Sequence, residues 1–336
     1  MPSTVFRPRG LLIAVLLGAL LAASGCADSG PPPADPPLTP ATGRFPATVP
    51  TAFGDVTVPE EPQRVVALGW GDAETAVALG VRPVGAADWL EFGGDGLGPW
   101  MQQRYDTPPE MLGTMEVSLE RIAALQPDVI LDTRSSGDPQ RYEQLSKLGV
   151  PVIAPPADAP QYLTTWQDQL DMVGAALGRT EQAAQLRAGL DAKFARAARE
   201  HPEFRGTEVA LGSRTAAGYG VYLDGSNRVE FLRALGFANS RAIQRQAAPG
   251  QFTMDISPER LDLLDAELTT MFTIYTDPAE VTGDPLFRGI PSVQDGRSVL
   301  LAEDEPAAQA ISSGTAPGLS FALDETVPEF AAALSR

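Results

Sequence analysis

Residues 118–131 show the clearest pattern of apolar and polar positions in the chain, a short helix that leads directly into a strand. Ser118 can cap the helix, because its side-chain oxygen can accept a hydrogen bond from a free N–H group of the first turn. Ile122 and Leu125 fall on one helical face. Pro127 ends the helix, and the four residues that follow it predict a buried strand.

The same pattern recurs without gaps in residues 257–268. Shared capping and apolar spacing can arise by chance, whereas the common Ser-x-Glu-Arg sequence favours one structural unit used twice. The repeat therefore indicates two similar lobes. Identical residues occupy these matching positions: Ser118 and Ser257, Glu120 and Glu259, Arg121 and Arg260, and Leu125 and Leu264.

Strand-like apolar runs alternate with helical patterns in both halves of the chain, which is typical of parallel sheets covered by helices. The predicted fold class is α/β, with two parallel-sheet α/β lobes joined by one long connecting α-helix. The N-terminal lobe is assigned to residues 51–159, the connecting helix to 160–178 and the C-terminal lobe to 179–336. The predicted strands are residues 53–58, 64–68, 83–87, 128–131 and 151–153, then 208–212, 220–223, 268–274 and 298–301.

The predicted connector, residues 160–178, lies between the two copies of the repeat. Its apolar residues recur at helical spacing, and Gly178 is a typical helix stop. At about 1.5 Å per residue the helix would span roughly 25 Å. A second helix is predicted at residues 180–200. The apolar positions of the connector are Leu163, Trp166, Leu170, Val173 and Leu177.

Residues 1–26 have the organisation of a lipoprotein signal peptide, with a positively charged start and an apolar run at 11–23 that is short for a membrane span. Residues 23–26 resemble a bacterial lipobox, with Ala23 where leucine is usual. The single cysteine of the chain, Cys26, stands where the lipobox needs it, which favours this interpretation over an ordinary signal peptide. The resemblance implies that Cys26 carries a diacylglyceryl group and becomes the mature N-terminus.

A proline-rich tether is predicted to follow, at residues 27–50. Proline favours extended backbone, and at about 3.1 Å per residue the tether could reach roughly 70 Å. Such a segment would hold a folded domain away from a membrane surface. Its prolines include Pro31, Pro32, Pro33, Pro36, Pro37 and Pro40.

The composition is that of an acidic globular protein. The 336 residues are 43% hydrophobic and carry a formal net charge of −18. An acidic chain is poorly suited to nucleic acid, because the phosphate backbone attracts cations. Cys26 and His201 are the only cysteine and histidine, so no internal disulfide and no Cys- or His-rich metal site can form.

Short segments over most of the mature chain resemble the lipoprotein-anchored iron–siderophore substrate-binding proteins of ATP-driven importers. This superfamily includes cobalamin-binding and hydroxamate-siderophore-binding proteins. The resemblance implies two α/β lobes joined by a long helix, and a binding protein rather than an enzyme. It is carried, in order, by residues 64–68, Glu74, residues 78–80, Val84-Gly85, residues 119–122, Leu125, residues 127–130, residues 176–179, Ser257, Glu259 and Gly296-Arg297.

We expect the ligand beyond the C-terminal ends of the strands, where open parallel sheets bind ligands. Aromatic side chains suit the apolar rim of a ferric siderophore, and arginine suits its hydroxamate, carboxylate or catecholate oxygens. Tyr219 and Tyr222 face opposite ways on one strand, and we favour Tyr219 for the cleft. Core packing or pairing with one of the many acids is the alternative for each residue. The predicted ligand-binding residues are Trp70, Trp89, Arg134, Arg214, Tyr219 and Tyr275.

The ligand class stays open at this point. Family members that bind hydroxamates place an arginine in the turn before the helix at 118, where this chain has Thr114-Met115. Cobalamin is the main alternative ligand, whereas haem would need an axial His or Tyr, and His201 lies far from any strand end. A surface-anchored hydrolase is a further alternative, although no Gly-x-Ser-x-Gly occurs and the acidic run at 303–305 is typical of a solvated surface.

The resemblance also implies that Glu120 and Glu259 dock the protein on its permease. In the family, the glutamates at these two positions engage arginines of the membrane permease, one from each lobe. Each carboxylate lies in the first turn of its helix, where it also stabilises the helix dipole, so simple stabilisation is the alternative.

The implied partners are a ferric siderophore, a dimeric ABC permease and the membrane through the lipid on Cys26, with no nucleic acid. Iron is expected only as part of the siderophore complex, with no other cofactor. We expect a monomer on the outer face of the cytoplasmic membrane, and the abundance of Ala, Gly, Pro and Arg is typical of a GC-rich actinobacterium.

Overall fold

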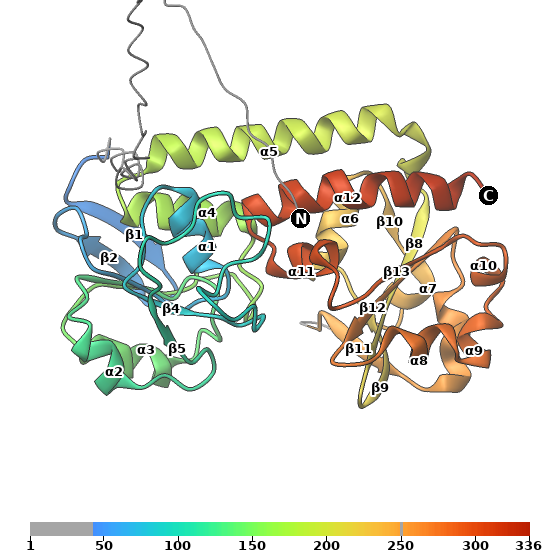
Figure 1. Cartoon of the computed structure of the whole chain (residues 1–336), viewed down its shortest axis with the longest axis horizontal. Helices are drawn as coiled ribbons and strands as arrows, with labels where there is room; N and C mark the ends of the chain where they lie inside the picture. Colours follow the sequence, from blue (N-terminus) through green and yellow to red (C-terminus); the bar gives the residue numbers. More distant parts are fainter. Residues whose placement is uncertain (1–42, 249–250) are drawn as a thin grey trace, which may run out of the picture. The chain divides into compact units, whose positions relative to one another are not determined.

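The computed structural model describes residues 43–248 and 251–336, which form two α/β lobes (Figure 1). The elements of the N-terminal lobe are β3 (Val65–Ala67), α1 (Asp72–Ala78), β4 (Gly85–Ala87), β5 (Glu110–Leu112), α2 (Leu119–Ala124), β6 (Val129–Leu131), α3 (Pro139–Ser146), β7 (Val152–Ile153) and α4 (Trp166–Ala176). The strands form one parallel sheet in the order β5-β4-β3-β6-β7.

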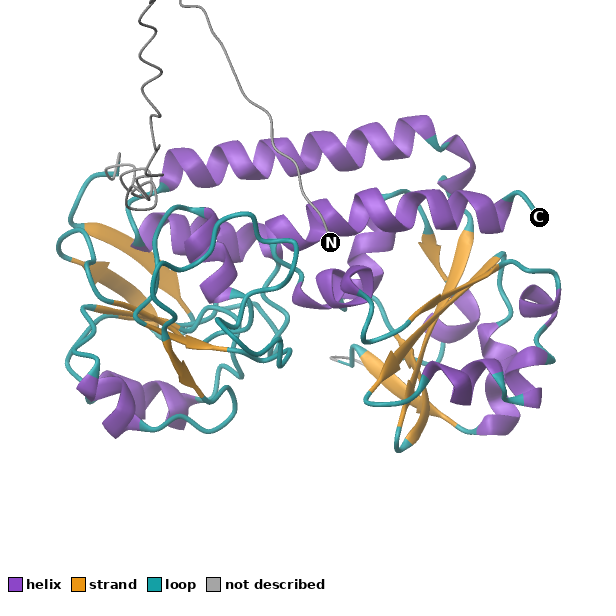
Figure 2. Cartoon of the chain, viewed as in Figure 1, coloured by secondary structure: helices purple, strands orange, loops and turns teal. Residues whose placement is uncertain are grey.

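Both faces of this sheet are covered by helices (Figure 2). Val65 and Ala67 share a core with residues of α1 and α4, whereas Val66 shares a core with Ile122 of α2 and Leu145 of α3. Successive residues of a strand point to opposite faces, so a strand buried on both sides is apolar at every position. This explains why these short strands are continuous apolar runs in the sequence.

A hairpin of β1 (Ala47–Thr51) and β2 (Gly54–Val58) precedes the sheet. The tether was predicted to continue to Pro50, but β1 pairs with β2, and Val49 and Val58 are buried. The folded lobe therefore begins before residue 51. Pro50 is tolerated within β1 because proline is compatible with an edge strand. The predicted signal peptide, Cys26 and the first part of the tether lie outside the described residues.

The C-terminal lobe contains a six-stranded sheet in the order β11-β9-β8-β12-β13, with β10 also paired to β8. Its strands are β8 (Glu208–Thr215), β9 (Gly218–Tyr222), β10 (Ala238–Asn239), β11 (Thr253–Ile256), β12 (Leu268–Ile274) and β13 (Ser298–Leu301). Its helices are η1 (Pro202–Phe204), α6 (Asn227–Ala234), α7 (Arg241–Gln244), η2 (Pro258–Leu264), α8 (Pro278–Thr282), α9 (Pro285–Arg288), α10 (Pro291–Gln294), α11 (Pro306–Ser313) and α12 (Ala316–Leu334).

This second sheet is mixed, whereas the sequence predicted a parallel one. β8 is parallel to β10 and to β12, and β12 is parallel to β13. In contrast, β9 is antiparallel to β8, and β11 is antiparallel to β9. Only Ala216 and Ala217 separate β8 from β9, and so short a connection makes a hairpin because a parallel crossover needs a dozen residues or more.

The long helix of the structure is not the one predicted as the connector. Tyr162 has a φ of 60°, and Thr165 caps α4 by accepting a hydrogen bond from the Asp168 N–H, so α4 begins at Trp166 rather than at residue 160. The next helix, α5 (Thr180–Glu200), has 21 residues. It packs on α4 at one end and on α12 farther along, and it runs across both lobes (Figure 1).

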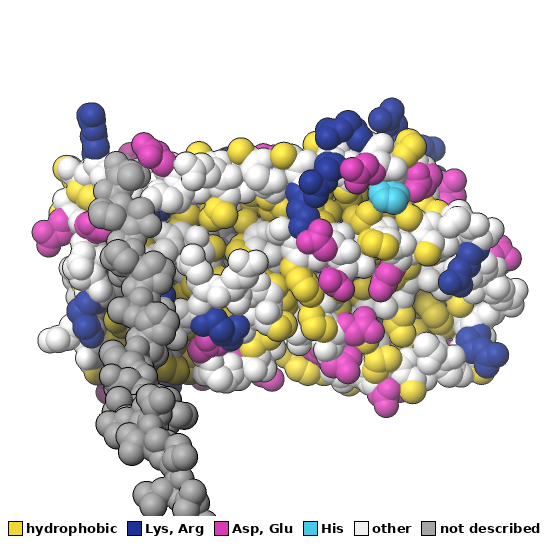
Figure 3. All heavy atoms as spheres, turned by 45° about the horizontal axis from the view of Figure 1, so that its top comes forward, with side chains coloured by type: hydrophobic (Ala, Val, Ile, Leu, Met, Phe, Trp, Pro, Cys, Tyr) yellow, Lys and Arg dark blue, Asp and Glu magenta, His cyan; other side chains and the backbone are white. Residues whose placement is uncertain are grey.

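Lys193 of α5 bonds to Asp324 of α12 at 2.6 Å, which ties the two long helices together. Acidic and basic side chains are both spread over the face that carries α5, with hydrophobic side chains visible between them (Figure 3). In the part of the chain that the structure describes, no helix is both long and apolar enough to cross a membrane.

The repeated helix–strand unit is present in both lobes, as α2 with β6 and as η2 with β12. Ser118 caps α2 by accepting from the Arg121 N–H. The second copy is a 3₁₀ helix that begins at Pro258 and is interrupted at Arg260, whose backbone leaves the helical conformation. The two units are therefore equivalent in order and place, but not in detailed geometry.

Candidate functional site

A cavity of about 360 Å³ lies between the lobes, at the C-terminal ends of strands from both sheets. We call it the strand-end cavity. Its N-terminal wall follows β3, β4 and β5, and its C-terminal wall comes from the ends of β12 and β13, from α11 and from the start of α6. Open α/β sheets bind ligands at this edge. Three of the predicted ligand-binding residues line it: Trp70, Trp89 and Tyr275.

Three aromatic rings form a stack at the N-terminal wall. Trp70 lies between Trp89 and Tyr162, with ring centroids 4.2 Å and 4.3 Å apart and interplanar angles of 2° and 25°. Such ring pairs add about 0.5–1.5 kcal/mol beyond their buried area, which holds both tryptophans in place. The Tyr162 hydroxyl donates to the Met115 sulfur at 3.4 Å. The stack is thus a preformed apolar wall joined to the loop after β5.

Tyr275 projects from the opposite wall. It is 69% exposed, and its φ of 50° lies in the left-handed region that residues other than glycine rarely adopt. Its N–H donates to the Glu303 carboxylate. Burial and the charges of Glu91 and Glu303 raise the pKa of the Tyr275 hydroxyl, which keeps this hydroxyl protonated. Glu91 also has a positive φ, of 55°, and backbone strain concentrates at ligand sites.

Arg228 is a cation of the cavity that sequence patterns did not reveal. Its guanidinium lies over the rings of Tyr222 and Phe272, at 4.9 Å and 5.1 Å from their centroids. Its Nη2 donates to the Ser312 hydroxyl at 2.7 Å, whereas its buried Nε has no partner among the described residues. A cation in the first turn of α6 opposes the helix dipole. That unfavourable placement is the one sequence signal that marks the residue.

Arg134 was predicted to bind ligand, but it is only 1% exposed and does not line the cavity. Its guanidinium donates to the backbone oxygens of Thr164 at 2.9 Å, Ser313 at 2.8 Å and Gly314 at 3.3 Å. The contacts with the connection between α11 and α12 join it to the C-terminal half of the chain. Burial lowers the pKa of Arg134 to about 10.

Two buried carboxylates complete this connection, which we call the lobe junction (Asp72, Glu74, Arg134 and Thr315). Glu74 accepts from the Thr315 hydroxyl at 2.6 Å, and Asp72 accepts from the Thr133 N–H at 2.9 Å. Burial raises the pKa of Asp72 to about 6 and also raises the pKa of Glu74. The lobe junction is a buried polar network whose carboxylates and guanidinium are all bonded to protein.

Arg214 and Tyr219 also lie away from the cavity, in contrast to their prediction as ligand residues. Arg214 pairs with Glu280 at 3.1 Å and covers the ring of Tyr219 at 5.1 Å. The Tyr219 hydroxyl donates to Asp284 at 2.7 Å, and the ring is buried in the core of the C-terminal lobe. The two tyrosines of β9 lie in different cores, and Tyr222 rather than Tyr219 lies beside the cavity, under Arg228.

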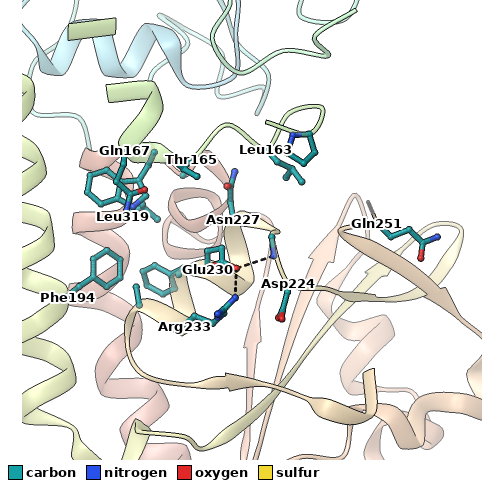
Figure 4. Close-up of a pocket in the computed structure, with 16 residues that line it drawn as sticks. Leu163, Thr165, Gln167, Phe194, Asp224, Asn227, Glu230, Arg233, Gln251 and Leu319 are labelled. Atoms are coloured by element: carbon teal, nitrogen blue, oxygen red, sulfur yellow. Dashed lines mark hydrogen bonds and ion pairs between the residues drawn. The ribbon is translucent and has the colours of Figure 1, made fainter. Parts of the chain in front are cut away.

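A second cavity has a volume of about 700 Å³, and Figure 4 shows the residues that line it. Asn227 and Gly314 line this larger cavity, whereas their near neighbours Arg228 and Ser312 line the strand-end cavity. The start of α6 and the end of α11 therefore separate the two. None of the six predicted ligand-binding residues lines the larger one.

Size alone would favour the larger cavity as the ligand site. Two of its charged groups are already paired, however, because Glu230 accepts from the Gly225 N–H and from Arg233, both at 3.1 Å (Figure 4). The strand-end cavity combines ring faces, a strained and exposed tyrosine and an arginine with no ion-pair partner among the described residues. Chemistry therefore selects the strand-end cavity as the candidate ligand site.

The two matched glutamates are exposed, each in the first turn of its helix. The Glu259 carboxylate bonds to its own backbone N–H and to the Ser257 side chain, and these contacts lower its pKa. Glu120 follows the capping Ser118 in α2. Both carboxylates are thus available to a partner. In the described residues, no group of three or more His, Cys, Asp and Glu side chains is placed to hold a metal ion.

Comparison with known proteins gives concordant results. Over 269 residues the chain is 25% identical to a protein named as a probable siderophore-binding lipoprotein of Bacillus subtilis, covering 72% of this chain and 75% of that one. Over 135 residues it is 30% identical to the vitamin B12-binding protein of Salmonella paratyphi A, covering 36% of this chain and 42% of that one.

The fold matches that of the Streptococcus pneumoniae iron-uptake protein PiaA in complex with ferrichrome. The TM-score is 0.72 at 22% identity, over 86% of this chain and 99% of that one. Residues 65–305 match the periplasmic binding protein family. This span includes both large sheets and every lining residue of the strand-end cavity outside α11. The chain belongs to the periplasmic binding protein family.

Proposed function

We propose that this protein is the extracytoplasmic substrate-binding component of an ABC importer and that it captures a ferric siderophore in the strand-end cavity. The observation that carries the proposal is the pairing of the stacked tryptophan wall with the unpaired Arg228, at the strand ends of a periplasmic binding protein. The names of the similar lipoprotein and of the similar structure support the same ligand class.

The aromatic rings and the arginine of the cavity would contact different parts of the chelate. The ring of Trp89 and the exposed ring of Tyr275 would pack against the apolar rim of the chelate, because aromatic faces bury large areas with little loss of side-chain freedom. Arg228 would donate from its Nη groups to the oxygens that surround the iron. Iron is cargo held by the siderophore, so the protein contributes recognition and no catalytic group.

The anchoring proposal rests on sequence alone. Cys26 would carry a lipid, and the proline-rich tether would hold a monomeric receptor at the outer face of the cytoplasmic membrane. Cys26→Ala should therefore abolish incorporation of labelled fatty acid, and unchanged labelling of the variant would contradict lipidation.

Docking on a dimeric permease would use Glu120 and Glu259, one carboxylate from each lobe. Their exposure and their equivalent places in the repeat support this role. Substituting both by alanine should abolish siderophore-dependent uptake in cells and leave ligand affinity in solution unchanged. Wild-type uptake by the double variant would show that the carboxylates only stabilise their helices.

The capture proposal is tested by titrating the purified protein with ferric siderophores while following tryptophan fluorescence. Trp70 and Trp89 line the strand-end cavity, so a bound iron chelate should quench their emission. The iron-free siderophores serve as the matched control. Saturable quenching by at least one ferric complex supports the proposal. The absence of quenching by every ferric complex in the panel contradicts it.

Cobalamin is the second candidate ligand, because the chain resembles a vitamin B12-binding protein over part of its length. The same titration with cobalamin separates the two, since saturable binding of cobalamin and of no ferric siderophore would establish a different cargo. Histidine ligation of haem is not compatible with the structure, because His201 pairs with Glu203 at 2.8 Å and stacks on Phe204 beyond the end of α5, away from both cavities.

A further inference from the structure

The strand-end cavity has an unusual balance of charge for a site that would hold an iron chelate. Its charged lining side chains are Glu91 from the N-terminal lobe, Glu303 from the C-terminal lobe, and Arg228. Both carboxylates act on the Tyr275 hydroxyl, and the Glu303 carboxylate also accepts from the Tyr275 N–H. Arg228 lies over Tyr222 and Phe272. The lining therefore carries one more negative than positive charge.

The other arginines near the cavity do not change this balance. The charge of Arg134 lies beside the buried carboxylates of Asp72 and Glu74, and Arg214 is paired with Glu280. Arg141 approaches the lining residue Thr114, donating to its backbone oxygen at 3.1 Å, but its charge is paired with Asp132 at 2.7 Å. Each of these guanidiniums already contacts acidic side chains, so among the described residues Arg228 is the one lining cation available to a ligand.

Ferric siderophores differ in net charge in a way that such a cavity would sense. Three singly charged hydroxamates neutralise ferric iron, and a free amine on the siderophore makes the complex cationic, whereas three doubly charged catecholates leave a trianion. A trianion would meet two carboxylates and one guanidinium at close range, where partial burial weakens dielectric screening. The protein's net charge of −18 would also slow its approach.

We propose that the strand-end cavity selects ferric complexes with no net negative charge, of the neutral or cationic trishydroxamate class, against trianionic catecholates. The proposal rests on the proposed function and narrows it. The ring faces of Trp89 and Tyr275 fit the same class, since they attract apolar rims and ammonium groups but offer no positive charge to an anion. Arg228 alone then serves the hydroxamate oxygens.

The test compares dissociation constants of the wild-type protein for three probes, by tryptophan quenching at one ionic strength. The probes are ferrioxamine B, which is cationic, ferrichrome, which is neutral, and ferric enterobactin, which is trianionic. We expect the trianion to bind more weakly than the better of the other two by at least about tenfold. Equal or tighter binding of the trianion overturns the inference and leaves siderophore capture standing. Binding of none of them, with binding of cobalamin, overturns both.

Charge variants test whether the charges of the strand-end cavity cause the weaker binding of the trianion. The double variant Glu91→Gln and Glu303→Gln should shift the ratio of trianion to ferrichrome affinity toward the trianion by about tenfold. The matched control removes two exposed carboxylates from the ends of α5, Glu181→Gln and Glu200→Gln, and should leave the ratio unchanged. An equal shift in both variants would assign selection to overall charge and overturn the role of the cavity.

Discussion

Two neighbouring groups of polar side chains between the lobes differ in what their charges contact. In the lobe junction, Arg134 spends its donors on three backbone oxygens, and Glu74 is bonded to Thr315. In the strand-end cavity, Arg228 keeps a free Nε and Tyr275 is exposed on a strained backbone. An arginine between the lobes is therefore a candidate ligand residue where its charge has no ion-pair partner among the described residues, as at Arg228, and not where buried backbone oxygens hold it, as at Arg134.

The largest expected effect comes from breaking the lobe junction. Arg134→Met would leave buried carbonyls unsatisfied and remove the cation beside Asp72 and Glu74, at a cost of roughly 3–5 kcal/mol in the free energy of unfolding. Urea denaturation measures this. The matched control, Arg121→Met, removes a half-exposed pair with Glu110 and should cost less than about 1 kcal/mol. A smaller loss for Arg134 than for Arg121 would contradict a structural role for the junction.

A second effect of the junction appears in the pH dependence of stability. Burial raises the pKa of Asp72 from 3.8 to about 6, so between these values the folded state binds the proton and the unfolded state does not. The free energy of unfolding therefore falls as pH rises through this window, by about 3 kcal/mol for this group. Asp72→Asn should flatten the fall in the urea midpoint over that range. Parallel curves for the variant and the wild type would show that Asp72 does not titrate there.

The smallest expected effect is on the affinity of the strand-end cavity for its ligand. Arg228→Met keeps an apolar stem over Tyr222 but removes the charged donor, and should weaken ferric-siderophore binding roughly tenfold. Arg233→Met is the matched control on the same helix, where Arg233 lines the larger cavity and pairs with Glu230. Loss of affinity in the Arg233 variant alone would move the ligand to the larger cavity.

Local patterns were sufficient to predict much of this architecture. The repeat around Ser118 and Ser257, and the apolar strand runs, predicted α/β lobes that the structure and the family match confirm. Trp70, Trp89 and Tyr275 line one cavity because each comes shortly after the end of a parallel strand, and the C-terminal ends of parallel strands share an edge. Where a residue's position follows from its own strand, sequence reasoning was enough.

The remaining features depend on contacts between distant segments. The satisfied state of Arg134 depends on backbone oxygens of Ser313 and Gly314, nearly 180 positions away, which no local pattern reveals. Tyr219 and Tyr222 were expected to face opposite ways, but their spacing does not say which one faces the cavity, and the structure places Tyr222 there, under Arg228. Arg228 reaches the cavity only because α6 starts beside α11.

The central claim, that the strand-end cavity holds the cargo, is tested most directly by locating iron. Crystals of the protein grown with ferrichrome would give an anomalous difference map at the iron absorption edge. We predict a single iron peak between Trp89, Tyr275 and Arg228. An iron peak in the larger cavity, beside Glu230 and Arg233, would contradict the site assigned here.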